Sequence, residues 1–232
     1  MNSSQKKSAI FSSVEKVAVI RGKRLAAAAD LVTDSTSPVY DLFCDHGILG
    51  EYFFRKTETY FNEIQEDCLE KIQARLNCSR DHLLLSPAKD ISIKENSFVF
   101  MMGVGGHTIT ECFEYWSENN RKNFEKGQTF ILSPHIHLIE MVSKLEKIGL
   151  NCLTRKFIWE KGQGYEIFCC SYKSGDQKGC FEAFEENFWS DLCATDCHAK
   201  KFLKYRMKFL NSYRGSNAAI IEYRTKLRSF VN

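Results

Sequence analysis

Short apolar runs alternate with helical spacings of apolar residues over the first three quarters of the chain, and this alternation predicts an α/β fold. We expect strands at residues 39–43, 59–63, 83–85, 97–102 and 129–132. The run 97–102 is continuously apolar, which is typical of a strand buried on both faces of a parallel sheet. Segments 151–159 and 165–173 are expected to pair as an antiparallel hairpin at the sheet edge. The fold class predicted for residues 1–175 is therefore a doubly wound, mostly parallel α/β sheet.

Helices are expected between these strands. The predicted ranges are 13–32 with a weak point at Gly22, a helix from the loop after residue 43 to about 56, 68–76, 106–116, and 136–148 with a C-cap at Gly149. After residue 180 the pattern changes to two stripes with helical spacing, separated by a turn at 214–217. The first stripe is Phe202, Tyr205, Phe209 and Tyr213, and the second is Ile220, Tyr223, Leu227 and Phe230. Residues 180–232 therefore predict a second unit, an antiparallel helical hairpin with basic outer faces.

Composition excludes several protein classes. No apolar run approaches the roughly 20 residues that a membrane span requires, and the N-terminus lacks the apolar core of a secretory signal. We therefore expect a cytoplasmic, monomeric protein with no membrane partner. Ten cysteines lie mostly in apolar segments, where a reduced thiol behaves as a small buried hydrophobe. Cys193, Cys197 and His198, with Cys180 upstream, lack the paired spacing of a zinc site, so no metal is expected.

The net charge of +3 hides an asymmetry, because positive charge gathers at the two ends of the chain. Residues 198–232 hold nine lysines and arginines against one acid, whereas residues 180–197 hold five acids and no lysine or arginine. Basic ends around a mildly acidic centre suit a polyanionic substrate such as RNA. Basic tails are also common on proteins that bind nothing specific, so the charge alone leaves both interpretations open.

Candidate chemistry lies in the loops that follow the predicted strands. The strand 39–43 contains Asp41 and leads into Cys44-Asp45-His46-Gly47, a polar loop before a helix. In open α/β sheets such loops bind nucleotides and related cofactors. Glu63 ends the next strand, 22 residues after Asp41, where a carboxylate commonly accepts hydrogen bonds from ribose hydroxyls. A surface acid with no such role is the alternative interpretation of Glu63.

A glycine-rich turn follows the most apolar strand. Gly103, Val104, Gly105 and Gly106 contain three residues without a Cβ, which lets backbone approach a ligand closely. A tight turn alone would also explain these glycines. Their place at the carboxyl end of the fourth predicted strand favours a role as the floor of a site in which a substrate base would react.

The same motifs resemble those of the bacterial tRNA adenine(22)-N1-methyltransferase family over roughly residues 20–170. The resemblance is carried by the segments Lys23-Arg24-Leu25, Asp41 with Asp45-His46-Gly47-Ile48-Leu49, Glu63-Ile64, Gly103-Val104-Gly105-Gly106, Ser133-Pro134-His135 and Gly164-Tyr165-Glu166-Ile167. It implies a Rossmann-like domain that binds S-adenosylmethionine and forms N1-methyladenine in tRNA, followed by a C-terminal helical hairpin. The implied cofactor-binding residues are Arg24, Asp41, Cys44, Asp45, Glu63, Ile64, Gly103, Val104, Gly105 and Gly106. The residues that the resemblance implies as contacts to RNA phosphates are Arg21, Lys23, Lys200, Lys201, Lys204, Lys208 and Arg214.

The resemblance also implies four catalytic residues. A fixed carboxylate near the adenine edge would stabilise the positive charge that moves to the ring, and Asp45 is the candidate. His46 would orient the loop, although a structural histidine is nearly as good an interpretation. His135 would line the base pocket, and Tyr165 would stack on a flipped base or simply be a buried tyrosine.

The chain also departs from the family pattern. The family usually has glycine where Phe43 stands, proline at Gly50, Gly-Pro at Asp67-Cys68, methionine at Val104 and Gln-Pro-Asn at Ser133-Pro134-His135. Ser86-Pro87-Ala88-Lys89 stands where an adenine-reading acid or amide is expected. Two alternatives therefore stay open. One is a catalytically degenerate methyltransferase fold that acts as an RNA-binding module, and the other is a small-molecule methyltransferase.

Overall fold

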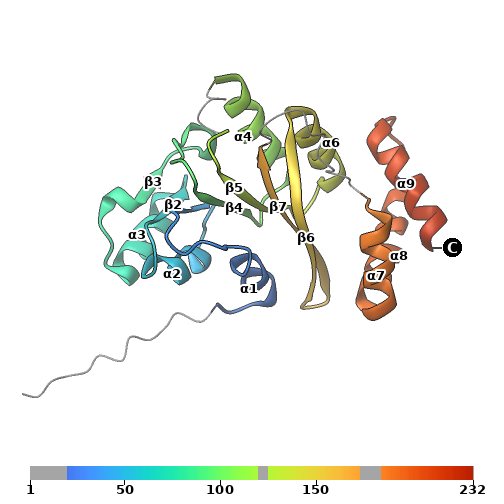
Figure 1. Ribbon diagram of the computed structural model, residues 1–232, viewed down its shortest axis with the longest axis horizontal. Coiled ribbons are helices and arrows are strands. Elements are labelled where there is room, and N and C mark those ends of the chain that lie inside the picture. The colour runs from blue at the N-terminus through green and yellow to red at the C-terminus, as the bar shows by residue number, and fades with distance from the viewer. Residues whose placement is uncertain (1–19, 120–124, 173–183, 232) are drawn as a thin grey trace, which may run out of the picture.

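The computed structural model describes residues 20–119, 125–172 and 184–231, and these residues form one seven-stranded sheet flanked by helices (Figure 1). The strand order is β3-β2-β1-β4-β5-β7-β6. The strands are β1 (Val39–Leu42), β2 (Thr59–Glu63), β3 (Leu83–Leu85), β4 (Phe98–Met102), β5 (Thr129–Ser133), β6 (Leu150–Glu160) and β7 (Gln163–Tyr172).

The direction of the strands confirms the predicted sheet. Strands β1 to β5 run parallel, whereas β7 is antiparallel to both β5 and β6. The chain moves outward from β1 to β3 and then returns to β4 on the other side of β1. The strand order therefore reverses between β1 and β4, and open α/β sheets bind ligands at the carboxyl ends of strands at such a switch point.

Helices cover both faces of the sheet (Figure 1). They are α1 (Lys23–Ala29), α2 (Ile48–Phe54), α3 (Glu66–Leu76), α4 (Gly106–Asn119), α6 (Leu138–Ile148), α7 (Glu186–Thr195), α8 (Cys197–Ser212) and α9 (Ala218–Val231), with 3-10 turns at Arg80–His82 and Ala88–Asp90. Strand β4 shows how the two layers arise. Phe98 and Phe100 pack with residues of α1 and α2, whereas Val99 and Met101 pack with residues of α4 and α6. A central strand buried on both faces must be continuously apolar, as the sequence predicted.

The β6–β7 hairpin extends beyond the carboxyl edge of the parallel strands. Leu132 of β5 pairs with Phe168 of β7, and Phe168 pairs with Arg155 of β6. Beyond that register, residues 156–160 pair only with 163–167. Five residues of strand span about 15 Å. The hairpin therefore forms a wall beside the loops at the carboxyl edge, with Tyr165 on it.

The C-terminal helices share a hydrophobic cluster with the sheet. The ring centroid of Phe157 on β6 lies 5.5 Å from that of Trp189 on α7 and 5.2 Å from that of Phe202 on α8. Beneath these rings, the buried Glu166 accepts hydrogen bonds from Arg155 and Arg206. The Arg206 guanidinium also donates to the Tyr223 hydroxyl at 2.9 Å. This network joins β6, β7, α8 and α9.

Two predicted helix features are wrong. Residues 20–22 are not helical, because Gly22 has a φ of 114°, which a helix cannot contain, and α1 begins only at Lys23. The rest of the predicted start, residues 13–19, lies outside the described residues. Helix α7 lies in the acidic segment, where no helix was predicted.

The stripe predicted for the first C-terminal helix is wrong at two of its four positions, because Phe202 is buried and Tyr213 packs against the core but Tyr205 and Phe209 do not. Tyr205 and Phe209 are 72% and 70% exposed, and the buried side is formed by Phe202, Leu203, Met207 and Leu210. The rotation of α8 follows from Arg206, which must face inward to reach Glu166. The second stripe is largely confirmed, because Ile220, Tyr223 and Leu227 are buried on α9.

Candidate active site at the carboxyl edge of the sheet

The loop after β1 has an unusual backbone. Phe43, Asp45 and Gly47 have φ values of 58°, 48° and 63°, all in the left-handed region. Only glycine adopts this region without cost, and non-glycine residues there cluster at ligand sites. Gly47 has no room for a side chain, because an added Cβ would lie 2.7 Å from the Ile72 side chain. The loop is therefore a tight turn that brings backbone and short polar groups to the sheet edge.

Asp41 lies beneath this loop. Its carboxylate is buried and accepts a hydrogen bond from the Gly50 backbone N–H at 2.8 Å, at the start of α2. Burial raises the pKa of Asp41 to about 7, although the hydrogen bond from Gly50 opposes the rise. The structure therefore directs this carboxylate toward helix α2. It fixes where the helix begins relative to β1.

Glu63, Asp45 and Ile64 lie together at the ends of β1 and β2. The Glu63 carboxylate accepts hydrogen bonds from the Asp45 N–H at 3.3 Å and from the Ile64 N–H at 2.8 Å. The Asp45 and His46 side chains are 70% and 71% exposed and lie 3.6 Å apart. Cys44 is buried between β1 and α3, among Phe61, Leu69 and Ile72. An exposed carboxylate edge thus remains available at both Glu63 and Asp45.

The glycine turn is attached to the loop after β5. The His135 N–H donates to the Val104 carbonyl at 3.0 Å, and the Gly106 N–H donates to the Ile136 carbonyl at 2.9 Å. Gly103 has a φ of 81°, and a Cβ there would lie 3.3 Å from the His135 ring nitrogen Nε2. A Cβ on Gly106 would lie 2.3 Å from the His137 carbonyl oxygen. The glycines therefore allow two loops to meet, with a narrow space above Gly103.

Arg24, His135 and Tyr165 come together beside that space. The Arg24 Nη1 atom lies 3.4 Å from His135 Nε2, so the guanidinium donates and Nε2 accepts. The guanidinium carbon of Arg24 lies 4.7 Å from the centroid of the Tyr165 ring, and the His135 ring is 5.9 Å from it. Burial, with the charge of Arg24, holds the pKa of His135 below its usual value. Both effects favour the neutral form of the His135 ring.

Glu160 holds this cluster in place, and no motif in the sequence pointed to it. Its carboxylate accepts a hydrogen bond from the Lys23 N–H at 2.7 Å and lies 3.5 Å from the Arg24 N–H. These are free N–H groups at the start of α1, which a helix otherwise leaves without partners. A carboxylate from the hairpin tip thus acts as a remote N-cap and positions Arg24. One acid among many in the sequence could not be singled out for this contact.

The sequence matches a known family, described as a methyltransferase domain, over residues 21–168. The match covers the sheet, the loops at its carboxyl edge and most of the hairpin. The chain belongs to the methyltransferase domain family. A comparison with curated proteins finds no match.

Solved structures show the same methyltransferase fold. M. capricolum TrmK, in complex with its cofactor product S-adenosyl-homocysteine, is 17% identical, with a TM-score of 0.65, 92% of this chain covered and 98% of that chain. The B. subtilis m1A22 tRNA methyltransferase TrmK is 15% identical, with a TM-score of 0.60, 92% of this chain covered and 100% of that chain. A ribosomal protein L11 methylase of Lactobacillus delbrueckii is 12% identical with a TM-score of 0.51 and covers 65% of this chain and 77% of its own. These likenesses establish the fold of the methyltransferase domain.

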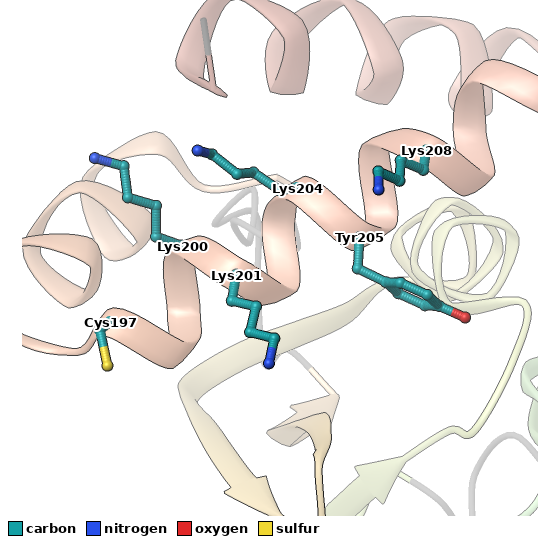
Figure 2. Close-up of a pocket in the computed structure, with 6 residues that line it drawn as sticks. All are labelled: Cys197, Lys200, Lys201, Lys204, Tyr205 and Lys208. Carbon is teal, nitrogen blue, oxygen red and sulfur yellow. The ribbon is translucent and has the colours of Figure 1, made fainter.

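The expected RNA-binding residues of this methyltransferase lie in three places. Arg21 and Lys23 are exposed at the start of α1, next to Arg24. Lys200, Lys201, Lys204 and Lys208 line a groove of about 420 Å³ on α8 together with Cys197 and Tyr205 (Figure 2). Arg214 is in the exposed turn before α9, where its guanidinium donates to the Asn211 carbonyl at 3.2 Å.

A small cluster of metal-ligand types lies at the start of α8. Asp196, Cys197 and His198 place one ligand atom each within 4.8 Å of one another. Asp196 is the N-cap of α8, and its carboxylate accepts from the His198 N–H at 2.8 Å. Helix capping therefore accounts for this arrangement. Among the described residues, no helix is long and apolar enough to cross a membrane.

Proposed function

We propose that this chain is an S-adenosylmethionine-dependent methyltransferase that forms N1-methyladenine in tRNA. The observation that carries the proposal is the extent of the structural likeness. The two TrmK structures match over 92% of this chain, including its C-terminal helices, whereas the L11 methylase matches 65%. A likeness that continues beyond the methyltransferase domain supports a shared substrate class as well as a shared reaction.

The residues at the sheet edge suit S-adenosylmethionine, which supplies a methyl group on a positively charged sulfur. Glu63 ends β2, and each of its carboxylate oxygens accepts one backbone hydrogen bond and has a second lone pair for a ribose hydroxyl. The Gly103 turn leaves a space that a Cβ would narrow, next to Arg24 and His135.

The same residues suit an adenine ring as the acceptor. The N1 lone pair lies in the ring plane, so methylation requires alignment more than removal of a proton. Asp45 places an exposed carboxylate where it would stabilise the positive charge that the ring acquires. The lowered pKa of His135 favours its neutral form, which adds no opposing charge. The Arg24 guanidinium lies over one face of the Tyr165 ring, and we assign stacking on the base to the other face. The basic residues of α1 and α8 would hold the phosphates of the tRNA.

Methylation of tRNA transcripts with radiolabelled S-adenosylmethionine tests the proposal. A methyl group on N1 blocks Watson–Crick pairing, so primer extension should stop at the modified adenine. We expect Asp45→Asn to lower kcat by about 100-fold and to change the KM for the cofactor little, as for loss of a charge that acts in the transition state. Glu118→Gln, an exposed acid at the end of α4, is the control. Equal rates for both variants would remove Asp45 from the mechanism.

Calorimetric titration separates the proposal from its alternatives. A protein that binds tRNA but not S-adenosylmethionine would be a degenerate RNA-binding module. A protein that transfers methyl groups to small amines and binds no tRNA would be a small-molecule methyltransferase. We also propose that the protein is a cytoplasmic monomer, which sedimentation and cell fractionation test.

A further inference from the structure

The outward side of helix α8 presents two parallel rows of side chains with helical spacing. Lys200, Lys204 and Lys208 form one row, four residues apart. Lys201, Tyr205 and Phe209 form the other row with the same spacing. Figure 2 shows Lys201 and Tyr205 pointing to the same side of the helix, with Lys200 and Lys204 on the other side of the groove. A basic row and a partly aromatic row therefore run side by side.

The lysines of these rows have no acidic partners in the part of the chain that the structure describes. None of the ion pairs found there includes Lys200, Lys201, Lys204 or Lys208. Helix α8 itself contains no aspartate or glutamate. The opposing side of α8 does have an ion pair, between Arg206 and Glu166. The outer charges are thus fully available to a polyanion.

The two aromatic residues are unusually exposed. Tyr205 is 72% and Phe209 is 70% exposed, the highest values among the exposed large hydrophobic residues of the described chain. The hydrophobic core of the C-terminal helices is complete without them, because Phe202, Leu203, Met207 and Leu210 fill it. Apolar surface stabilises the folded state only when it is buried, so two rings left in water contribute nothing to the free energy of folding. Their exposure therefore calls for a ligand with apolar faces.

The surface continues toward the candidate active site through the hairpin. The Trp159 ring stacks on His198 of α8 with centroids 5.0 Å apart, and the Lys201 ammonium lies 5.7 Å from the Trp159 centroid. The next residue, Glu160, holds the start of α1 and so positions Arg24. Lys201 heads the row that contains Tyr205 and Phe209. The tip of the β6–β7 hairpin therefore connects the two rows on α8 with the cluster of Arg24, His135 and Tyr165.

We propose that Tyr205 and Phe209 stack on unpaired bases of the RNA substrate while the neighbouring lysines hold its phosphates; this rests on the proposed tRNA substrate. Every base has an apolar face, so two exposed rings bind unpaired nucleotides with little sequence preference. A duplex keeps its bases stacked inside the helix and offers only its phosphates and groove edges. A loop or a junction satisfies both rows at once. A second copy of the chain fits less well, because it would bring the same row of lysines against these.

Binding assays with three probes test the proposal, using the full chain throughout. The probes are a tRNA transcript, a twelve-nucleotide oligouridine and a blunt RNA duplex. We expect Tyr205→Ala and Phe209→Ala each to weaken binding of the first two by about tenfold and to leave duplex binding unchanged. Phe209→Trp should restore affinity, and its fluorescence should fall when RNA binds. Leu153→Ala, which removes an exposed apolar side chain of β6, is the matched control.

The dependence of RNA affinity on salt concentration separates the contribution of the lysine row from that of the aromatic residues. Lys204→Gln should lower the slope of log affinity against log salt by about 0.7, whereas the aromatic variants should leave that slope unchanged. Equal losses on the duplex and on oligouridine, or full affinity of the double alanine variant for tRNA, would overturn stacking. A wild-type dimer that Tyr205→Ala converts to a monomer would also overturn it, in favour of a contact between copies. If wild-type protein binds none of the probes, the proposed tRNA substrate fails first.

Discussion

The loop after β1 and the network around Glu166 hold polar groups in opposite surroundings, the first exposed and the second buried. The loop places polar groups at the surface and adopts left-handed backbone at Phe43 and Asp45. The Glu166 network buries three charged groups and satisfies the carboxylate on both oxygens. The buried network ties β6 and β7 to α8 and α9, so the C-terminal helices stabilise the hairpin that carries Tyr165 and Glu160 at the candidate site.

The largest effect is expected from breaking the network with Glu166→Gln. Burial would raise the pKa of Glu166, but the charges of Arg155 and Arg206 outweigh it and hold the pKa below its usual value. Removing the carboxylate charge takes away the buried anion that Arg155 and Arg206 share, so urea unfolding should show a loss of about 3–5 kcal/mol. Glu51→Gln breaks an exposed ion pair with Arg75 and should cost less than about 1 kcal/mol. Similar losses for both variants would contradict the assigned role.

The next effect concerns pH and the carboxyl group beneath the loop. The pKa of Asp41 is raised to about 7 in the folded protein, so the folded state holds its proton more tightly than the unfolded state. Stability should therefore fall as pH rises from about 4 to about 7, by up to about 4 kcal/mol from this group. Asp41→Asn should remove that part of the pH dependence. Thermal unfolding of both proteins at pH 5 and pH 7.5 measures it, and unchanged pH dependence would refute the assignment.

A smaller effect is expected at the ribose contact. If Glu63 accepts hydrogen bonds from the cofactor's ribose, Glu63→Gln should weaken S-adenosylmethionine binding by about 1.5–3 kcal/mol, or about 10- to 100-fold. Glu66→Gln changes an exposed acid three residues later and should leave affinity unchanged. Calorimetric titration provides the readout. Equal affinity for both variants would mean that Glu63 only orders the loop through its contacts with Asp45 and Ile64.

The smallest expected effect on the free energy of unfolding distinguishes backbone strain from side-chain packing at Phe43. Phe43→Ala and Phe43→Gly both remove the half-buried ring, but only glycine relieves the left-handed backbone. We expect the glycine variant to be more stable than the alanine variant by about 1 kcal/mol, the reverse of the usual order in regular structure. Urea unfolding of the pair measures this difference. A more stable alanine variant would show that the loop relaxes without the ring.

Local patterns predicted the parallel sheet well, because buried central strands must be apolar and sheet loops must turn. Strands 59–63 and 83–85 match the structure to the residue. The rotation of α8 was not predictable from its own apolar spacing, because Tyr205 and Phe209 fit a helical stripe as well as Phe202 and Met207 do. Arg206 decides between these stripes by pairing with a carboxylate 40 residues away.

The order of elements, the glycine turn and the acids Asp45 and Glu63 near the ends of β1 and β2 were all predictable from the chain alone. These features depend on residues that are close in the chain and on local backbone preferences. The folded protein was needed to learn that Glu160 caps α1, that Arg24 contacts His135 and Tyr165, and that two aromatic rings of α8 face the solvent. Each of these depends on a long-range contact, and side-chain spacing along one segment carries no information about the partner that folding brings to it.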